Sequence, residues 1–486
     1  MRGDPMLSEA PLSKSRYLRW LQCPLRLYLD VHHRELATPP AASVQARFDV
    51  GHRVGALART RYPGGVLVEQ GPHQHAEAVA RTADLIRSGT RDIFEAAFTY
   101  DHVKIRADVL HALDGGGFEL VEVKSTSRYD PAKHLPDVGI QAYVTLGAGL
   151  DVRRVTLMHL DTTYVWPGGP YDPERILAAT DVTAEAFDYA RNMAPHVAEM
   201  IAILEAAEPP SVQPSDAICR RPYECEFYAY CTRGIEPPDG LDVEPTVDAT
   251  TAQRLEELRF PLLFVDFETV NPALPLFPGT SPFQVVKVQW SVHRLEADGA
   301  LTHDEWLVAS ADTDPQPEFL STLLDALGRS GTFVHYSPYE LTQLVDLAAR
   351  LPDMRDQLLA TLPGLYDKVA QRLADRGEEL PPRPDTGGGL ASFDLGREAV
   401  ARGVSHPALA GTWSIKAALP ILAPSLPPYS SLAVTDGDAA MLATAEMLDP
   451  ETPPERRAEL RKALLRYCEQ DTLAMVEIYR RMVSRA

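Results

Sequence analysis

The apolar pattern of the chain is most informative between Leu262 and Val270, where LLFVDFETV carries two carboxylates in an otherwise apolar run. A strand places alternate side chains on one face, so Asp266 and Glu268 point the same way. Apolar residues on both faces are typical of a central strand that is covered on both sides. Because unpaired charge is costly to bury, the two acids predict a divalent cation, to which they would supply oxygen ligands. The alternative is an acid pair at a strand end that caps a helix or binds arginine.

An alternating pattern also runs through residues 94–127, which predicts three strands, the last two joined by a Gly-rich turn. Glu122 and Lys124 would share one face of the third strand, and the hairpin would bring Asp108 of the second strand beside them. In metal-dependent nucleases with this arrangement, the acids bind metal and the lysine orients or activates the attacking water. The alternative is a solvated Glu-x-Lys pair on an exposed strand face.

Two further segments place candidate site residues on helices. A strand that leads into a helix is predicted around Glu340, in the run GTFVHYSPYELTQL. Glu340 is interpreted either as a metal ligand or as part of a capping box with Ser337. Residues 459–482 have the period of an amphipathic helix, which puts Tyr467 and Asp471 on one face. The alternative for this pair is a core tyrosine beside a solvated acid.

Length and charge bound the class of protein. At 486 residues the chain exceeds a single ordinary core, and the Pro-, Asp- and Thr-rich stretch 236–252 is interpreted as a linker between domains at 1–235 and 253–486. The net charge of −21 argues against non-specific attraction to nucleic acid, but catalytic acids count as negative until metal binds them. The sequence shows no signal-peptide pattern and no apolar run of membrane-spanning length. It therefore predicts a cytoplasmic protein with no membrane partner.

The cysteines add a cofactor prediction. Cys219, Cys225 and Cys231 follow one another with five intervening residues, and Cys23 lies far upstream. Structural zinc sites usually show two closely spaced ligand pairs, whereas an iron–sulfur cluster can take its thiolates from distant segments. The pattern therefore favours an iron–sulfur cluster of the [4Fe–4S] type over zinc. Cys468 is interpreted as a buried structural thiol.

With these motifs, residues 1–235 resemble the RecB-like nucleases of the PD-(D/E)XK type that carry an iron–sulfur staple. The resemblance implies an α/β nuclease fold in which the four cysteines hold the cluster and the acids beside Lys124 bind Mg²⁺ or Mn²⁺. It adds Gln141, on the helix after the Glu-x-Lys strand, to the predicted site. Gly55 stands where that family has a metal-binding histidine, and Thr145 where it has a tyrosine.

Residues 253–486 resemble the DEDDy exonucleases, which have an RNase H-like fold. An Asp-x-Glu strand, an acid where a strand meets a helix and a final Tyr-x-x-x-Asp helix occur here in that family's order. In the second motif, Tyr336 stands for the family's Asn and Glu340 for its Asp. The resemblance implies a site with four ligands for two Mg²⁺ or Mn²⁺ ions and a tyrosine that orients the attacking water: Asp266, Glu268, Glu340, Asp471 and Tyr467.

Together the motifs predict a metal-dependent nuclease that hydrolyses phosphodiester bonds of DNA or RNA, with DNA favoured, in DNA repair or processing. The C-terminal domain is predicted to be a 3′-to-5′ exonuclease, and the N-terminal domain a second nuclease centre or a strand-binding module. The alternative is a catalytically weak nucleic-acid-binding or scaffold subunit that recruits a helicase or a recombination protein.

Overall fold

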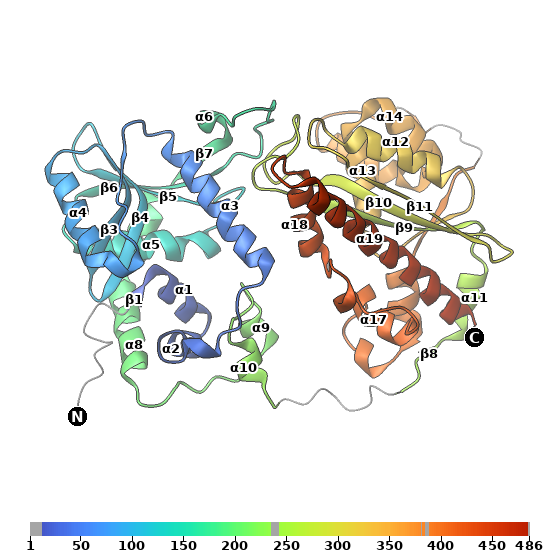
Figure 1. The fold of residues 1–486 in the computed structure, drawn as a ribbon, viewed down its shortest axis with the longest axis horizontal. Helices are drawn as coiled ribbons and strands as arrows, with labels where there is room; N and C mark the ends of the chain where they lie inside the picture. The colour runs from blue at the N-terminus through green and yellow to red at the C-terminus, as the bar shows by residue number, and fades with distance from the viewer. Residues whose placement is uncertain (1–11, 235–242, 381, 384–387, 485–486) are drawn as a thin grey trace. The chain divides into compact units, whose positions relative to one another are not determined.

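A computed structural model describes residues 12–234, 243–380, 382–383 and 388–484. The chain forms two compact units (Figure 1). The first comprises Met1–Val165, Gly169–Ile235 and Ser281–Phe283, and the second comprises Trp166–Gly168, Glu236–Thr280 and Gln284–Ala486. Each unit combines helices with a sheet of parallel and antiparallel strands, so the predicted α/β class is confirmed at this level.

The sheet of the first unit has the order β2–β3–β4–β5–β6–β7, and β1 pairs with β4. Strands β3, β4 and β5 are antiparallel, whereas β5 and β6 are parallel and are connected through helix α5. The predicted Gly-rich turn joins β4 to β5, with Gly116 and Gly117 at φ values of 80° and 77° that favour glycine. The strands are β1 (Leu12–Ser13), β2 (Val66–Leu67), β3 (Asp92–Tyr100), β4 (Val103–Ala112), β5 (Phe118–Val123), β6 (Val152–Leu160) and β7 (Leu177–Asp181).

Helices pack against this sheet around one apolar core, which includes Tyr17, Ile105, Leu120 and Val144. Asp130 caps α5, because its side chain accepts a hydrogen bond from the backbone N–H at the helix start. The helices are α1 (Lys14–Gln22), α2 (Pro24–His32), α3 (Ala42–Arg59), α4 (His75–Arg87), α5 (Pro131–Gly147), α6 (Pro173–Ile176), α7 (Thr183–Arg191), α8 (Met193–Glu205), α9 (Asp216–Cys219) and α10 (Tyr228–Thr232).

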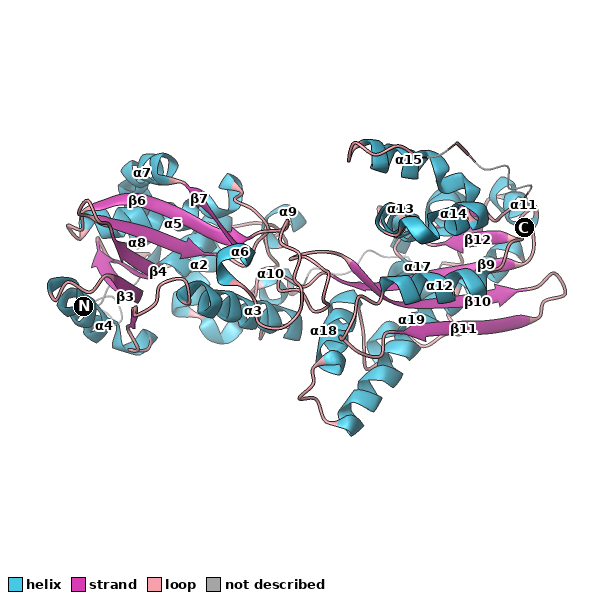
Figure 2. Cartoon of the chain, turned by 90° about the horizontal axis from the view of Figure 1, so that it is seen from above, coloured by secondary structure: helices cyan, strands magenta, loops and turns pink. Residues whose placement is uncertain are grey.

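The sheet of the second unit has the order β11–β10–β9–β12–β13 (Figure 2). The run that the sequence predicted as a central strand is β9, which lies between antiparallel β10 and parallel β12. Leu262 and Phe264 pack in one core with α19, and Leu263 and Val265 pack in another with α12, α13 and α14. The strands are β9 (Leu262–Val270), β10 (Val286–Leu295), β11 (Leu301–Leu307), β12 (Thr332–His335) and β13 (Ala391–Asp394).

The long C-terminal helix α19 crosses one face of this sheet, and its contacts include β9, β10 and β11. It is the amphipathic helix that the sequence predicted, although it begins five residues earlier, at Pro454. The helices of the unit are α11 (Ala249–Glu256), α12 (Gln316–Leu327), α13 (Tyr339–Arg350), α14 (Pro352–Thr361), α15 (Tyr366–Ala374), α16 (Ala401–Gly403), α17 (Ile415–Leu422), α18 (Gly437–Leu448) and α19 (Pro454–Val483).

The predicted linker at 236–252 was wrong for its second half. Residues 235–242 lie outside the described part of the chain, but beyond them β8 (Thr246–Val247) pairs with β14 (Val404–Ser405) and α11 follows. Asp248 caps α11 by accepting a hydrogen bond from the N–H of Thr251 at 3.0 Å. The Asp and Thr residues that resembled a loop by composition therefore cap and begin a helix, so this stretch belongs to the folded second unit.

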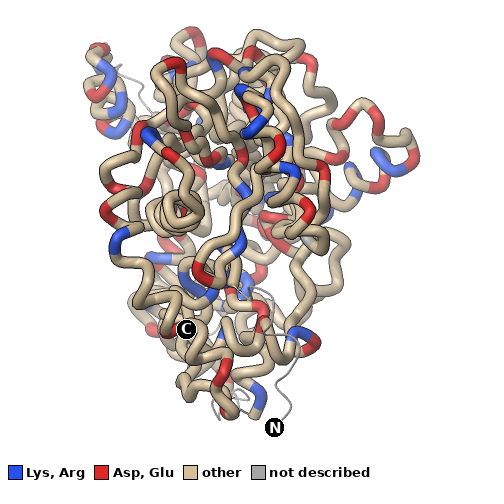
Figure 3. The backbone as a smooth tube through the Cα atoms, turned by 90° about the vertical axis from the view of Figure 1, so that its left-hand side faces the viewer, with Lys and Arg blue, Asp and Glu red and all other residues tan. Residues whose placement is uncertain are grey.

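Lys and Arg are interspersed with Asp and Glu along the backbone (Figure 3). The net charge of −21 reflects an excess of 68 acidic over 47 basic residues rather than one acidic tract. No helix in the described part of the chain is both long enough and apolar enough to cross a membrane.

Candidate active sites and cysteine cavity

The second unit brings together the four acids that the sequence predicted for a metal site. Asp266 and Glu268 lie on β9, Glu340 is in the first turn of α13, and Asp471 lies on α19. Glu340 and Asp471 are buried, and the other two are half-buried. The charges of Asp471, Glu268 and Glu340 all act on Asp266, so the four carboxyl groups lie near one another. Among the described residues, the ligand atoms of Asp266 and Glu268 lie within 4.8 Å of each other, in a group that does not include Glu340 or Asp471.

These carboxyl groups repel one another in a poorly solvated place. Burial raises the pKa of Asp266 well above its ordinary value, and the three neighbouring acids raise it further. Burial also raises the pKa of Glu268 well above its usual range, with Asp471 adding to the shift and Lys416 opposing it. The pKa of Asp471 rises to about 6 through burial, again against Lys416. Because a nearby positive charge favours ionised carboxylates, a divalent cation would relieve this repulsion.

A tyrosine pair lies beside the acids. Tyr467 is on α19, one turn before Asp471, and both side chains are buried, so the tyrosine lies in the core as the alternative interpretation expected but the acid is not solvated. Burial and the neighbouring acids raise the pKa of Tyr467, which favours the protonated phenol. The hydroxyl of Tyr429 donates to Asp471 Oδ1. Tyr429 was not predicted, because it lies in a Pro- and Ser-rich turn that has no motif spacing.

Cys468 has a closer relation to the acids than the sequence indicated. It is fully buried, as predicted, but its thiol Sγ lies 3.4 Å from Asp266 Oδ2 and donates to it. One ligand atom each from Cys468, Asp266 and Glu268 lies within 4.8 Å of the others. The thiol therefore borders the acidic site and is more than a packing group in the core.

Glu340 keeps features of both interpretations made for it. Its Oε2 is buried and has no hydrogen-bond partner among the described residues. Burial raises its pKa to about 8, and Asp394 and Asp471 raise it, while the backbone N–H groups of Glu340 and Ser337 oppose the rise. The predicted capping box is not formed in full, because α13 begins at Tyr339 and Ser337 Oγ accepts from the N–H of Tyr339 at 3.2 Å instead of from Glu340. The influence of the acids fits a shared metal site.

The first unit also brings its predicted residues together, but in a different electrostatic state. Glu122 is buried on β5, and its carboxylate accepts hydrogen bonds from Gln141 at 2.6 Å and from Lys14 at 2.8 Å. Lys124 Nζ lies 2.7 Å from Glu122 and also contacts Asp137. The two lysines lower the pKa of Glu122 against the effect of burial. This carboxylate is thus neutralised by protein cations.

Asp108 stands at the edge of this network. It accepts a hydrogen bond from the N–H of Val123 at 2.7 Å. Burial raises its pKa to about 8, and Glu122 adds to the rise while Lys14 and Lys124 oppose it. The negative charge of Asp108 is therefore the one in this centre that the nearby lysines compensate least.

Two members of the first unit's network were missed by the sequence analysis. Asp137 lies one turn before Gln141 on α5 and bonds to its Nε2 at 3.1 Å, a spacing that could have indicated it. Lys14 lies on α1, 108 residues before Glu122, and gave no local signal. Its Nζ contacts Asp137 at 3.1 Å, so it bridges two acids.

The two departures from the family pattern lie at positions with different surroundings. Gly55 lies on α3, and a Cβ placed on it would meet nothing within 4 Å, so the position has room for a side chain but offers no ligand. Thr145 Oγ1 donates to the backbone carbonyl of Gln141 at 2.8 Å, so its hydroxyl is used within α5.

The four predicted cluster cysteines line one cavity of the first unit. Cys23 lies between α1 and α2, and the other three lie on or between α9 and α10. Mostly apolar side chains complete the lining, together with Arg26 and Tyr228, and the pKa of Cys225 is raised to about 11 by burial. In the described part of the chain, no three of the four sulfur atoms lie within 4.8 Å of one another. The cysteines that line the cavity are Cys23, Cys219, Cys225 and Cys231.

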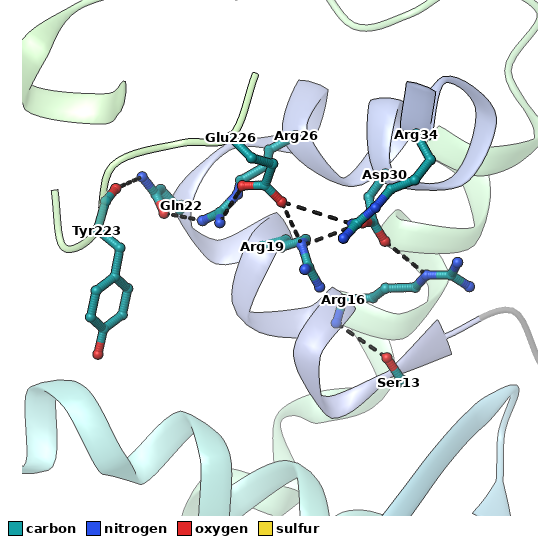
Figure 4. Close-up of polar contacts among 9 residues, drawn as sticks. All are labelled: Ser13, Arg16, Arg19, Gln22, Arg26, Asp30, Arg34, Tyr223 and Glu226. Carbon is teal, nitrogen blue, oxygen red and sulfur yellow. Dashed lines mark hydrogen bonds and ion pairs between the residues drawn. The ribbon is translucent and has the colours of Figure 1, made fainter. Parts of the chain in front are cut away.

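Half-buried ion pairs tie the cysteine segment to α1 and α2 (Figure 4). Glu226, next to Cys225, accepts hydrogen bonds from Arg26 at 2.8 Å and from Arg19 at 3.0 Å. Gln22 donates to the backbone carbonyl of Tyr223 at 2.8 Å. The segment is therefore held to the first helices by contacts that involve no cysteine.

Comparison with known families gives one partial match. Residues 263–375 match a family model described as "Domain of unknown function (DUF2779)". The match begins within β9 and ends just after α15, so it includes Glu340 but neither Tyr467 nor Asp471. No curated protein matches this chain.

Proposed function

We propose that the second unit is a divalent-metal-dependent nuclease of the DEDDy exonuclease type with an RNase H-like fold. The observation that carries the proposal is the convergence of four acids from three elements on one poorly solvated site, where their mutual repulsion raises the pKa of Asp266 and Glu268. Acids buried in this way without matching protein cations are typical of sites that hold metal ions. The site residues fit Mg²⁺ or Mn²⁺, because their ligand atoms are carboxylate oxygens.

In this proposal the protein groups have separate tasks. Asp266, Glu268, Glu340 and Asp471 would hold the ions, which when bound supply Lewis-acid stabilisation of the attacking and leaving oxygens. Tyr467 holds the water in line through its protonated hydroxyl, since its raised pKa leaves the phenol a donor. Tyr429 fixes one oxygen of Asp471 and so orients that ligand. The substrate would be a nucleic-acid strand end, with DNA favoured over RNA.

The direct test is hydrolysis of a short strand labelled at its 5′ end by the purified full-length chain with Mg²⁺ or Mn²⁺. We expect stepwise shortening from the 3′ end, and loss of several orders of magnitude in rate for Asp266→Ala. Asp304→Ala, an exposed acid on β11, is the matched control and should retain the wild-type rate. An unchanged rate in Asp266→Ala would show that this centre is not the nuclease.

We also propose that the first unit is a RecB-like module with the PD-(D/E)XK fold and a [4Fe–4S] cluster held by its four cysteines. The feature that supports the cluster is the cavity that all four thiols share.

A second nuclease centre in the first unit competes with a strand-binding role. The Glu122 carboxylate is already bonded by Lys14 and Lys124, which favours the binding role or a weaker, Mn²⁺-preferring activity. The test uses the Asp266→Ala variant, in which we expect the centre of the second unit to be inactive. Residual Mn²⁺-dependent cleavage that disappears in the Asp266→Ala, Lys124→Ala double variant would establish a second active centre. No residual cleavage, with strand binding retained, would establish a binding module or scaffold that recruits a helicase or a recombination protein.

A further inference from the structure

A second group of potential metal ligands lies on the α19 face of the second unit's sheet, one strand away from the four acids. His293 on β10 and His303 on β11 are directly opposite each other in register, and their rings stack with centroids 4.4 Å apart. One ring nitrogen of each histidine and one carboxylate oxygen of Glu469, on α19, lie within 4.8 Å of one another. No motif of the predicted nuclease includes these three residues.

Hydrogen bonds hold one nitrogen of each ring. His293 Nδ1 lies 2.7 Å from Thr472 Oγ1, and His303 Nε2 lies 2.8 Å from Ser291 Oγ. The two hydroxyl oxygens lie 2.8 Å apart, and Thr472 Oγ1 is also 3.0 Å from the backbone carbonyl of Glu469, to which it can donate. When Thr472 donates to this carbonyl, it accepts from His293 Nδ1.

The other nitrogen of each ring, Nε2 of His293 and Nδ1 of His303, has no hydrogen-bond partner among the described residues and is available to a metal ion. Burial and His303 lower the pKa of His293 to about 4, so its ring is neutral at physiological pH. An imidazole that donates its other N–H to a fixed acceptor is the usual form of a histidine that binds metal.

Glu469 can serve as the third ligand at little cost. Its Oε2 accepts a hydrogen bond from Arg466 at 2.8 Å, but both side chains of this pair are partly exposed, at 31% and 45%. An exposed ion pair of this kind contributes little to stability and is readily exchanged. Two histidines and one carboxylate are a ligand set typical of zinc, with water in the fourth position.

We propose that His293, His303 and Glu469 form a site for a divalent transition-metal ion of the zinc class, distinct from the carboxylate centre. Such an ion would tie α19 to the β10–β11 hairpin. Glu469 lies between Tyr467 and Asp471 in sequence but on another side of the helix, so the ion would fix the helix that carries those residues. The proposal does not depend on nuclease activity.

The test is zinc binding by the full-length chain in excess Mg²⁺, which keeps the carboxylate centre filled with a hard ion. After equilibrium dialysis, we expect His303→Gln to hold one zinc ion per chain fewer than the wild type. Zinc should raise the melting temperature of the wild type more than that of His303→Gln, because a ligand stabilises only the state that binds it. Zinc at the cysteines would be equal in both proteins and so cancels.

Three further variants make the result decisive. His406→Gln removes another buried imidazole from the same unit and should bind zinc like the wild type. Thr472→Val breaks the hydrogen-bond chain and should weaken zinc binding about 10- to 100-fold, as expected for a group that orients a ligand. If His303→Gln fails to fold, Glu469→Gln replaces it as the test. Equal zinc content and equal thermal shifts in the wild type and the folded ligand variant would overturn the proposal.

Discussion

Tyr467 is the water-positioning residue of the proposed mechanism. Burial and the neighbouring acids raise its pKa, so the proposal assigns its hydroxyl the positioning of water rather than the removal of a proton. We expect Tyr467→Phe to reduce the single-turnover rate about 10²- to 10⁴-fold, the range for a positioning or acid–base group. Metal affinity should change little, since the ring and its packing remain. Tyr479→Phe, on the same helix but in the core, is the matched control.

A single isosteric substitution can decide whether Glu340 is a capping residue or a metal ligand. A capping role predicts that Glu340→Gln has normal turnover and a small loss of stability, since glutamine also serves in a capping box. A ligand role predicts near-complete loss of turnover with the melting temperature unchanged or raised, because a buried acid repelled by Asp394 and Asp471 has been neutralised. Turnover and thermal unfolding, measured on the same preparation, separate the two.

The control for this change is Glu318→Gln, which alters a first-turn glutamate of α12 in the same unit. It should leave turnover unchanged. Normal turnover in Glu340→Gln would remove Glu340 from the metal site and leave three acids there.

At the scale of elements, the sequence predicted those parts of the two centres that follow local periodicity. Strand β9 was found with its bounds, because its apolar run is covered on both faces and its two acids alternate with the period of a strand. The helix with Tyr467 and Asp471 followed from its 3.6-residue period. Lys14 and Tyr429 were not found, because each reaches its site only through tertiary packing. Asp137 was within reach of the sequence, since it precedes Gln141 by one helical turn.

The cysteine segment, residues 215–232, is an element whose folding can be tested apart from the sheet. The first unit has its own large apolar core, whereas the cysteines pack on a small cluster around Tyr28, Leu29 and Phe227. We therefore expect Cys225→Ser to abolish iron binding and expose this segment to proteolysis, while the sheet stays folded. Iron analysis, the visible absorbance of anaerobically purified protein and limited proteolysis measure the two effects.

Cys468→Ala is the matched control for this prediction, because Cys468 belongs to the second unit and does not line the cavity. It should keep the full iron content and the brown colour. Zinc as the sole metal in the wild type, with no visible absorbance, would contradict the cluster proposal.

At the scale of the whole molecule, the two units handle buried acids differently. In the first unit, Lys14 and Lys124 neutralise Glu122 within the protein. In the second unit, Lys416 is the cation that offsets the repulsion at Glu268 and Asp471, and the pKa of those acids stays raised. The metal-free second unit should therefore depend on pH much more strongly than the first.

The sign of this dependence follows from the raised pKa values. Asp266 and Glu268 have a pKa well above the ordinary value, Glu340 about 8 and Asp471 about 6, so the folded state holds protons that the unfolded chain has already released. The stability that these acids contribute to the metal-free unit is therefore full below about pH 4 and falls as the pH rises toward about 8. Mg²⁺ should remove most of this fall in stability, because bound cations compensate the ionised carboxylates.

Thermal unfolding of the full-length chain from pH 5 to 8, with chelator or with Mg²⁺, measures both effects. The Asp266→Asn, Glu268→Gln double variant, which lacks two of the titrating groups, should show a much shallower slope in chelator. A wild-type slope no steeper than that of the double variant would mean that these acids are already compensated without metal.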